Sequence, residues 1–206
     1  MKTEEKLADN MFVYHNLLSE YADDIIKTYH ETEDHKTEST VSSKASSLYL
    51  PNPYDFNDAE SELFDKWVDL SIKIQSTVSD TVLNDYISKY GPYSRDYMFL
   101  SCYIIHYPPG TKANLHTDTE LLAKDIDNHL GYAAPLSVVA YLNDDYDGGE
   151  IVFPHQNVKW KPKKGSVLVC PSGFAYPHYT EVADKDRYAL ICLFIKRGEA
   201  SAPKGY

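Results

Sequence analysis

The chain has 206 residues, of which 43% are hydrophobic and 25% charged, as in an ordinary globular protein of one large domain or two small ones. No apolar run approaches the length of a membrane span, and the polar start lacks a secretion signal, so we expect a cytoplasmic protein without a membrane segment. The formal net charge of −11 argues against a nucleic-acid partner.

The three cysteines, Cys102, Cys170 and Cys192, show no CxxC spacing and lie in apolar, strand-like segments. An odd number without such spacing favours neither a disulfide framework nor a zinc–cysteine site. We therefore expect three buried thiols that act as small hydrophobic side chains.

The first half of the chain mixes short strands with helices. Residues 11–18 read as a strand or extended entry, and a helix is expected from about 19 to 29. The polar segment 30–47, rich in Ser and Thr, is predicted to be a mobile loop, and 48–50 a brief strand.

A long amphipathic helix is predicted next. It begins at the N-cap residue Asn57 and ends near Gly91. Its apolar residues recur every three or four positions, which is typical of a helix that covers a sheet. These residues are Leu63, Trp67, Leu70, Ile74, Val78, Val82 and Tyr86.

From Tyr97 onward, the pattern changes to short runs separated by turn signals, which indicate strands. Eight strands of this kind point to an antiparallel double-stranded β-helix, the jelly roll of the cupin type, with N-terminal supporting helices. The expected strands cover 97–107, 113–118, 134–143, 150–154, 157–161, 165–170, 174–179 and 187–196.

We expect a single domain over 1–206. Within it, 1–92 would be a helical support region, 93–197 the jelly-roll core and 198–206 a tail. The segment 119–133 has helical spacing but loop-like flanks, so we interpret it as a mobile cover over a site.

His116 and Asp118 are two residues apart, so on a strand both side chains would lie on one face. His178, 62 residues later, is the candidate for a third metal ligand. Two histidines and one carboxylate on one side of a metal form the facial triad of non-haem Fe(II) oxygenases. The HxD spacing alone is a weak signal, so its weight depends on the remaining motifs.

Arg187 begins the last predicted strand, where alternation places it on the same face as Ala189 and Ile191. A guanidinium in an apolar interior needs an anion. That anion could be a carboxylate of the protein, or the distal carboxylate of a small dicarboxylic acid bound to the metal.

Five motifs in order resemble those of the prolyl 4-hydroxylase-like 2-oxoglutarate/Fe(II) dioxygenases. The family pattern YxPGxxxxxHxD is similar to the segment from Tyr107 to Asp118. The other blocks are YLN at 141–143, GGEIVFP at 148–154, PKKG at 162–165, and His178 followed by Arg187-Tyr188-Ala189.

The resemblance implies a role for each matching residue. His116, Asp118 and His178 would bind Fe(II), and Arg187 would hold the distal carboxylate of 2-oxoglutarate. Tyr141 would add a hydroxyl to that carboxylate and Tyr107 would line the cosubstrate pocket; the alternative is that both are ordinary core tyrosines.

The implied activity is hydroxylation of an unactivated C–H bond with O2, releasing succinate and CO2, and the family allows ascorbate as a reductant. The resemblance favours a prolyl residue in a peptide or protein as substrate. An oxygenase acting on a free amino acid or other small molecule stays open, as does a catalytically silent cupin-like binding module.

Overall fold

The computed structural model describes residues 3–32, 36–39, 41–42, 44–50, 62–90, 97–118 and 136–196. The described helical elements are α1 (Ala22–His30), α2 (Glu62–Thr77), the π-helical turn η2 (Val78–Leu83) and α3 (Asn84–Tyr90). The strands are β1 (Thr3–Ala8), β2 (Met11–His15), β3 (Thr37–Glu38), β4 (Ser46–Leu50), β5 (Tyr97–Tyr107), β6 (Leu136–Tyr141), β7 (Ile151–Phe153), β8 (Val158–Trp160), β9 (Val167–Pro171), β10 (Tyr179–Thr180) and β11 (Arg187–Lys196).

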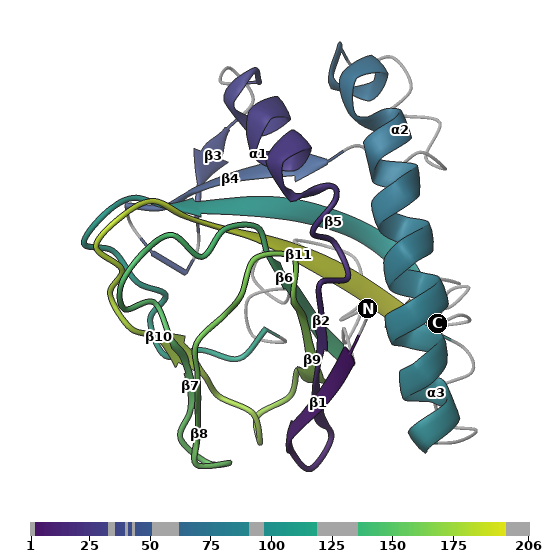
Figure 1. The fold of residues 1–206 in the computed structure, drawn as a ribbon, viewed down its shortest axis with the longest axis vertical. Coiled ribbons are helices and arrows are strands. Elements are labelled where there is room, and N and C mark those ends of the chain that lie inside the picture. The colour runs from purple at the N-terminus through teal and green to yellow at the C-terminus, as the bar shows by residue number, and fades with distance from the viewer. Residues whose placement is uncertain are drawn as a thin grey trace, which may run out of the picture.

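These strands form two antiparallel sheets. The larger has the order β1-β2-β9-β6-β11-β5-β4-β3, and the smaller has the order β10-β7-β8. The long strands β5 and β11 run side by side across the molecule, and the smaller sheet lies beside one end of them (Figure 1). The mainly β architecture with flanking helices agrees with the predicted fold class.

Strand β11 has two chemically different faces because successive side chains alternate. Tyr188, Leu190 and Cys192 belong to the larger hydrophobic core beneath the helices. Arg187, with Ala189 and Ile191, instead lines a cavity between the two sheets. The sheet therefore separates a packing face from a face that carries polar groups.

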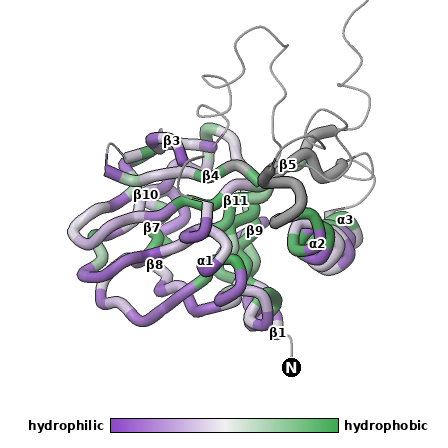
Figure 2. Tube along the Cα trace, turned by 90° about the horizontal axis from the view of Figure 1, so that it is seen from above, coloured by the Kyte–Doolittle hydropathy of each residue, from purple (hydrophilic) through white to green (hydrophobic). Residues whose placement is uncertain are grey.

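The helices cover the packing face. Ile25 and Tyr29 of α1 are buried in the same core as Trp67 and Ile74 of α2. Hydrophobic residues gather on β9 and β11, whereas β8 at the periphery is hydrophilic (Figure 2). The predicted long helix ends at Tyr90 as α3, close to the expected position, while its proposed N-cap, Asn57, lies outside the described residues.

Three expectations about the chain need correction or lie beyond the described residues. Residues 113–118 do not form a strand, because only His116 bridges to His178 in an isolated antiparallel pair. The segment 30–47, expected as a mobile loop, includes the end of α1, strand β3 and the buried Val41. The proposed cover, 119–133, lies outside the described part of the chain.

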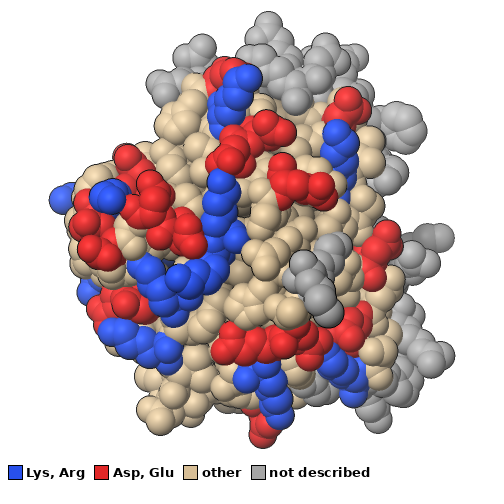
Figure 3. Space-filling view, viewed as in Figure 1, with Lys and Arg blue, Asp and Glu red and all other residues tan. Residues whose placement is uncertain are grey.

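Residues 3–8 form an edge strand that the sequence did not predict, since its polar pattern lacks the alternation of a half-buried strand. All three cysteines are buried and free, as expected. No helix among the described residues is long and apolar enough to cross a membrane. Acidic and basic side chains lie next to one another across the face drawn in Figure 3.

Candidate active site

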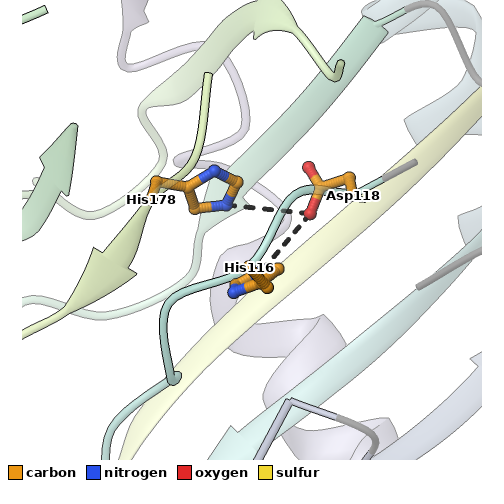
Figure 4. Close-up of side chains that lie close together, drawn as sticks. All are labelled: His116, Asp118 and His178. Carbon is orange, nitrogen blue, oxygen red and sulfur yellow. Dashed lines mark ion pairs between the residues drawn. The ribbon is translucent and has the colours of Figure 1, made fainter. Parts of the chain in front are cut away.

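His116, Asp118 and His178 come together at one end of the cavity. One potential ligand atom from each residue lies within 4.8 Å of the other two. The Oδ1 atom of Asp118 is 3.4 Å from Nε2 of His116 and 3.7 Å from Nε2 of His178. The three side chains point toward one another (Figure 4). The structure thus brings together the three residues that the sequence singled out.

The backbone fixes this convergence even though 113–118 is not a strand. The N–H of His116 donates to the carbonyl of His178 at 3.0 Å, and the N–H of His178 donates to that of His116 at 2.9 Å. These paired hydrogen bonds hold the two histidines opposite each other, and Asp118 follows His116 two residues later. An isolated bridge therefore does what the predicted strand was expected to do.

Each imidazole ring is oriented by a hydrogen bond from its Nδ1 atom to a backbone carbonyl. Nδ1 of His116 lies 2.6 Å from the carbonyl of Asn114, and Nδ1 of His178 lies 3.2 Å from the carbonyl of Tyr176. A carbonyl only accepts, so each neutral ring carries its proton on Nδ1. The lone pair on Nε2 then faces the centre of the cluster, which is the arrangement found in histidine metal ligands.

The protonation states also suit a cation site. Burial alone would raise the pKa of the Asp118 carboxyl, but His178, His116 and the Ser137 hydroxyl outweigh it and lower that pKa to about 2. Burial lowers the pKa of His178, which favours its neutral form. An ionised carboxylate beside a neutral imidazole is a donor pair suited to a divalent metal.

Arg187 is the most buried charged residue among the described residues and is only 1% exposed. Its Nη2 donates to the hydroxyl of Thr180 at 3.0 Å, and its Cζ lies 4.0 Å above the centre of the Tyr107 ring. Its Nε has no hydrogen-bond partner, and no carboxylate of the described residues forms an ion pair with it. The guanidinium is held in place by neutral groups and has no counter-ion within the described part of the chain.

Two tyrosine hydroxyls near this guanidinium are also unsatisfied. Tyr141 is 1% exposed, and its hydroxyl lacks a hydrogen-bond partner, as does that of the buried Tyr146. Burial raises the pKa of both tyrosines, that of Tyr146 to about 12, so both stay protonated and can donate. Buried donors without partners are uncommon in folded proteins and indicate a missing acceptor.

The sequence pointed to Tyr107, Tyr141 and Arg187 but not to two other residues of this site, Thr180 and Tyr146. Thr180 could have been found by alternation, because it lies two positions after His178 on the same run. Tyr146 lies in the loop between β6 and β7, where no periodic pattern marks a residue that points inward.

The rest of the cavity lining is apolar. Residues from β5, β6, β7 and β11 face it together with Val41, whose carbonyl accepts a hydrogen bond of 3.2 Å from the N–H of Asn114. The supposed mobile loop therefore supplies part of this wall. The apolar lining residues are Val41, Tyr103, Ile105, Ala113, Val139, Ile151, Ala189 and Ile191.

Residues 100–195, which hold the candidate site, match the model of the 2OG-Fe(II) oxygenase superfamily. Over this stretch the chain is similar to the superfamily, which is named for its use of 2-oxoglutarate and Fe(II). No curated protein matches the chain.

Solved structures share the fold at low sequence identity. A viral collagen prolyl hydroxylase from Paramecium bursaria Chlorella virus-1, in complex with 2OG, is 16% identical, with a TM-score of 0.59 over 93% of this chain and 99% of that one. A prolyl-4-hydroxylase from Pseudomonas putida is 19% identical, with a TM-score of 0.59 over 92% and 94%.

A Trichoplax adhaerens prolyl hydroxylase, in complex with a peptide fragment of the hypoxia inducible factor oxygen degradation domain, is 18% identical. Its TM-score is 0.63, and the match covers 94% of this chain and 88% of that one. These likenesses confirm the predicted jelly-roll core.

Proposed function

We propose that this chain is a 2-oxoglutarate- and Fe(II)-dependent dioxygenase that hydroxylates an unactivated C–H bond. One observation carries the proposal: a buried guanidinium without a carboxylate partner among the described residues lines the same cavity as a His-Asp-His cluster. The first feature calls for an anion and the second for a cation. A small dicarboxylic acid that chelates a metal satisfies both.

In this proposal, His116, Asp118 and His178 hold the iron. Two imidazole nitrogens and one carboxylate oxygen are the donors of the facial triad, which leaves positions open for other ligands. The second oxygen of Asp118, Oδ2, is buried without a hydrogen-bond partner, so it can accept from another ligand of the same ion. When bound, Fe(II) supplies the oxidative chemistry that couples decarboxylation of 2-oxoglutarate to hydroxylation of the substrate.

Arg187 and Tyr141 would bind the distal carboxylate of 2-oxoglutarate. The unpartnered Nε of Arg187 and hydroxyl of Tyr141 are both donors that a carboxylate can accept from. The ring of Tyr107 stacks against the guanidinium and keeps its plane fixed, so little side-chain freedom is lost on binding. This arrangement favours the cosubstrate over a protein carboxylate as the anion that Arg187 meets.

We further propose a prolyl residue in a peptide or protein as the substrate, with ascorbate as a reductant. The apolar cavity wall suits an uncharged aliphatic group and would disfavour a charged side chain. Several structural neighbours are prolyl hydroxylases, and the one from Trichoplax adhaerens was solved with a peptide. Their low identity makes the substrate a proposal from likeness of fold.

Two other functions remain as alternatives. A free amino acid or other small molecule could occupy the same apolar wall, because fold does not decide substrate. A silent binding module is disfavoured, since binding alone does not require a metal cluster and an unpaired arginine in one cavity.

The test is a panel of proline-containing peptides and free amino acids, incubated with Fe(II), 2-oxoglutarate and O2, with and without ascorbate. We expect succinate to form in step with the gain of one oxygen atom by a peptide. His178→Ala is the matched control, and it should abolish both products. Hydroxylation of a free amino acid alone would select the small-molecule alternative, and a lack of succinate with every candidate would favour the binding module.

A further inference from the structure

Thr180 connects the His-Asp-His cluster with the buried Arg187. It lies on β10 two residues after His178, is 5% exposed and lines the cavity together with Arg187. No motif marks this position. Its hydroxyl accepts a hydrogen bond from the buried guanidinium of Arg187.

The hydroxyl oxygen of Thr180 accepts two hydrogen bonds. The backbone N–H of Ala113 donates to Oγ1 at 2.9 Å, and Nη2 of Arg187 donates to the same atom at 3.0 Å. A hydroxyl oxygen has two acceptor lone pairs and one proton. Both lone pairs are therefore used, and the proton is the one hydrogen-bonding capacity that remains.

That proton has no acceptor among the hydrogen bonds of the described residues. The Tyr141 hydroxyl and Nε of Arg187 are also donors without a hydrogen-bond partner. Thr180, Tyr141 and Arg187 all line one cavity. The N–H of Thr180 donates to the carbonyl of Ala113 at 3.2 Å, so Ala113 holds both the backbone and the hydroxyl of Thr180 in place. Because both lone pairs of the hydroxyl oxygen are engaged, the direction of its proton is set by the two donors.

We propose that Thr180 is a cosubstrate-positioning residue, whose hydroxyl donates to the distal carboxylate of 2-oxoglutarate while its oxygen holds Arg187 in place. This inference rests on the proposed function, because it needs a carboxylate at Arg187. Three donors would then converge on one carboxylate: the guanidinium, the Tyr141 hydroxyl and the Thr180 hydroxyl. Such a set selects a keto acid with a second carboxylate over one without it.

The test compares the binding of two keto acids to the Fe(II)-loaded protein by calorimetry without oxygen. 2-Oxoglutarate has the distal carboxylate, and 2-oxopentanoate carries a methyl group in its place. Thr180→Val keeps the shape of the side chain and removes the hydroxyl, while Thr180→Ser keeps the hydroxyl. Iron content and thermal unfolding are measured for every variant.

In Thr180→Val, we expect the affinity for 2-oxoglutarate to fall by about tenfold or more, since a hydrogen bond to a charged group is lost. The affinity for 2-oxopentanoate should change by less than about twofold, because the two keto acids differ only at the distal carboxylate. Thr180→Ser should stay within about threefold of the unchanged protein for both. If Thr180→Val does not fold, Thr180→Ala replaces it in the same comparison.

An equal loss for both keto acids would assign Thr180 a purely structural role and overturn the proposal. An unaltered affinity for 2-oxoglutarate in Thr180→Val would also overturn it. If the unchanged protein binds iron but not 2-oxoglutarate, the proposed function itself fails, and this result is distinct from the other two.

Discussion

At the scale of the residue, the buried guanidinium of Arg187 is only partly satisfied by its neighbours. Burial of a charge without a counter-ion is costly, and the neutral partners around it only partly replace water. The Thr180 hydroxyl and the Tyr107 ring satisfy one edge and one face of the guanidinium. Nε remains unsatisfied, so the side chain is prepared for an anion that the described protein does not supply.

Gly149 controls the room around Arg187 and allows a test of that placement. Its φ is +67°, and a Cβ there would lie 2.7 Å from the Tyr146 ring and 3.3 Å from Cδ of Arg187. We therefore predict that Gly149→Ala loses stability and also weakens 2-oxoglutarate binding by about tenfold, because the ring or the arginine stem must shift. Calorimetric titration of the iron-loaded protein measures this loss.

Gly110→Ala is the matched control. Gly110 has a φ of +78°, but a Cβ there would meet nothing within 4 Å. Both substitutions carry about 1–2 kcal/mol of left-handed backbone strain, so both should lower the unfolding temperature. Only Gly149→Ala should lower the affinity for 2-oxoglutarate, and equal affinities in the two variants would refute the crowding argument.

At the scale of the element, the two faces of β11 separate packing from chemistry. Alternation in the sequence correctly placed Arg187, Ala189 and Ile191 on one face, and the structure finds all three on the cavity. Long strands and the long helix were predictable because their apolar repeats extend over many residues. The bounds of β5 and β11 agree with those expected, at Tyr97–Tyr107 and Arg187–Lys196.

Short irregular segments were not predictable. Residues 113–118 were expected as a strand, yet tertiary hydrogen bonds between His116 and His178 position the candidate ligands instead. The segment 30–47 was expected to be mobile because it is polar, but its few apolar residues, such as Val41, are buried against distant parts of the chain. Local composition does not reveal contacts that depend on the whole fold.

Helix α2 allows a test of the separation between the two faces. Trp67 is fully buried in the core on the packing face, so Trp67→Ala should cost about 3–5 kcal/mol of unfolding free energy. Ile72 on the same helix is 41% exposed, and Ile72→Ala should change stability by less than about 0.5 kcal/mol. Denaturant unfolding measures both values.

Iron and 2-oxoglutarate affinities should be the same for both helix variants below their unfolding transitions. The cavity residues lie on the opposite face of β11 from the core that holds Trp67. A large loss of cosubstrate affinity in folded Trp67→Ala would show that the two faces are coupled.

At the scale of the whole molecule, one antiparallel sheet joins distant parts of the chain into a single site. Strands β5, β6 and β11 supply the floor of the cavity, and the His116–His178 pair closes one end. The helices add buried apolar area on the other side of the sheet. The similarity of residues 100–195 to the 2OG-Fe(II) oxygenase superfamily fits this division, since such chemistry depends on a metal and a keto acid held in a rigid β framework.

The most direct test of this account is the affinity of the iron-loaded protein for 2-oxoglutarate, without oxygen, in the unchanged protein and in Arg187→Met. Methionine keeps a similar volume and removes the charge, so a loss of about 1.5–3 kcal/mol is expected from the charge-assisted hydrogen bonds. The affinity should then fall by about ten- to a hundredfold, while iron binding stays the same because Arg187 is not in the His-Asp-His cluster. An unaltered affinity with iron still bound would contradict the account, because the anion at Arg187 could then not be the cosubstrate.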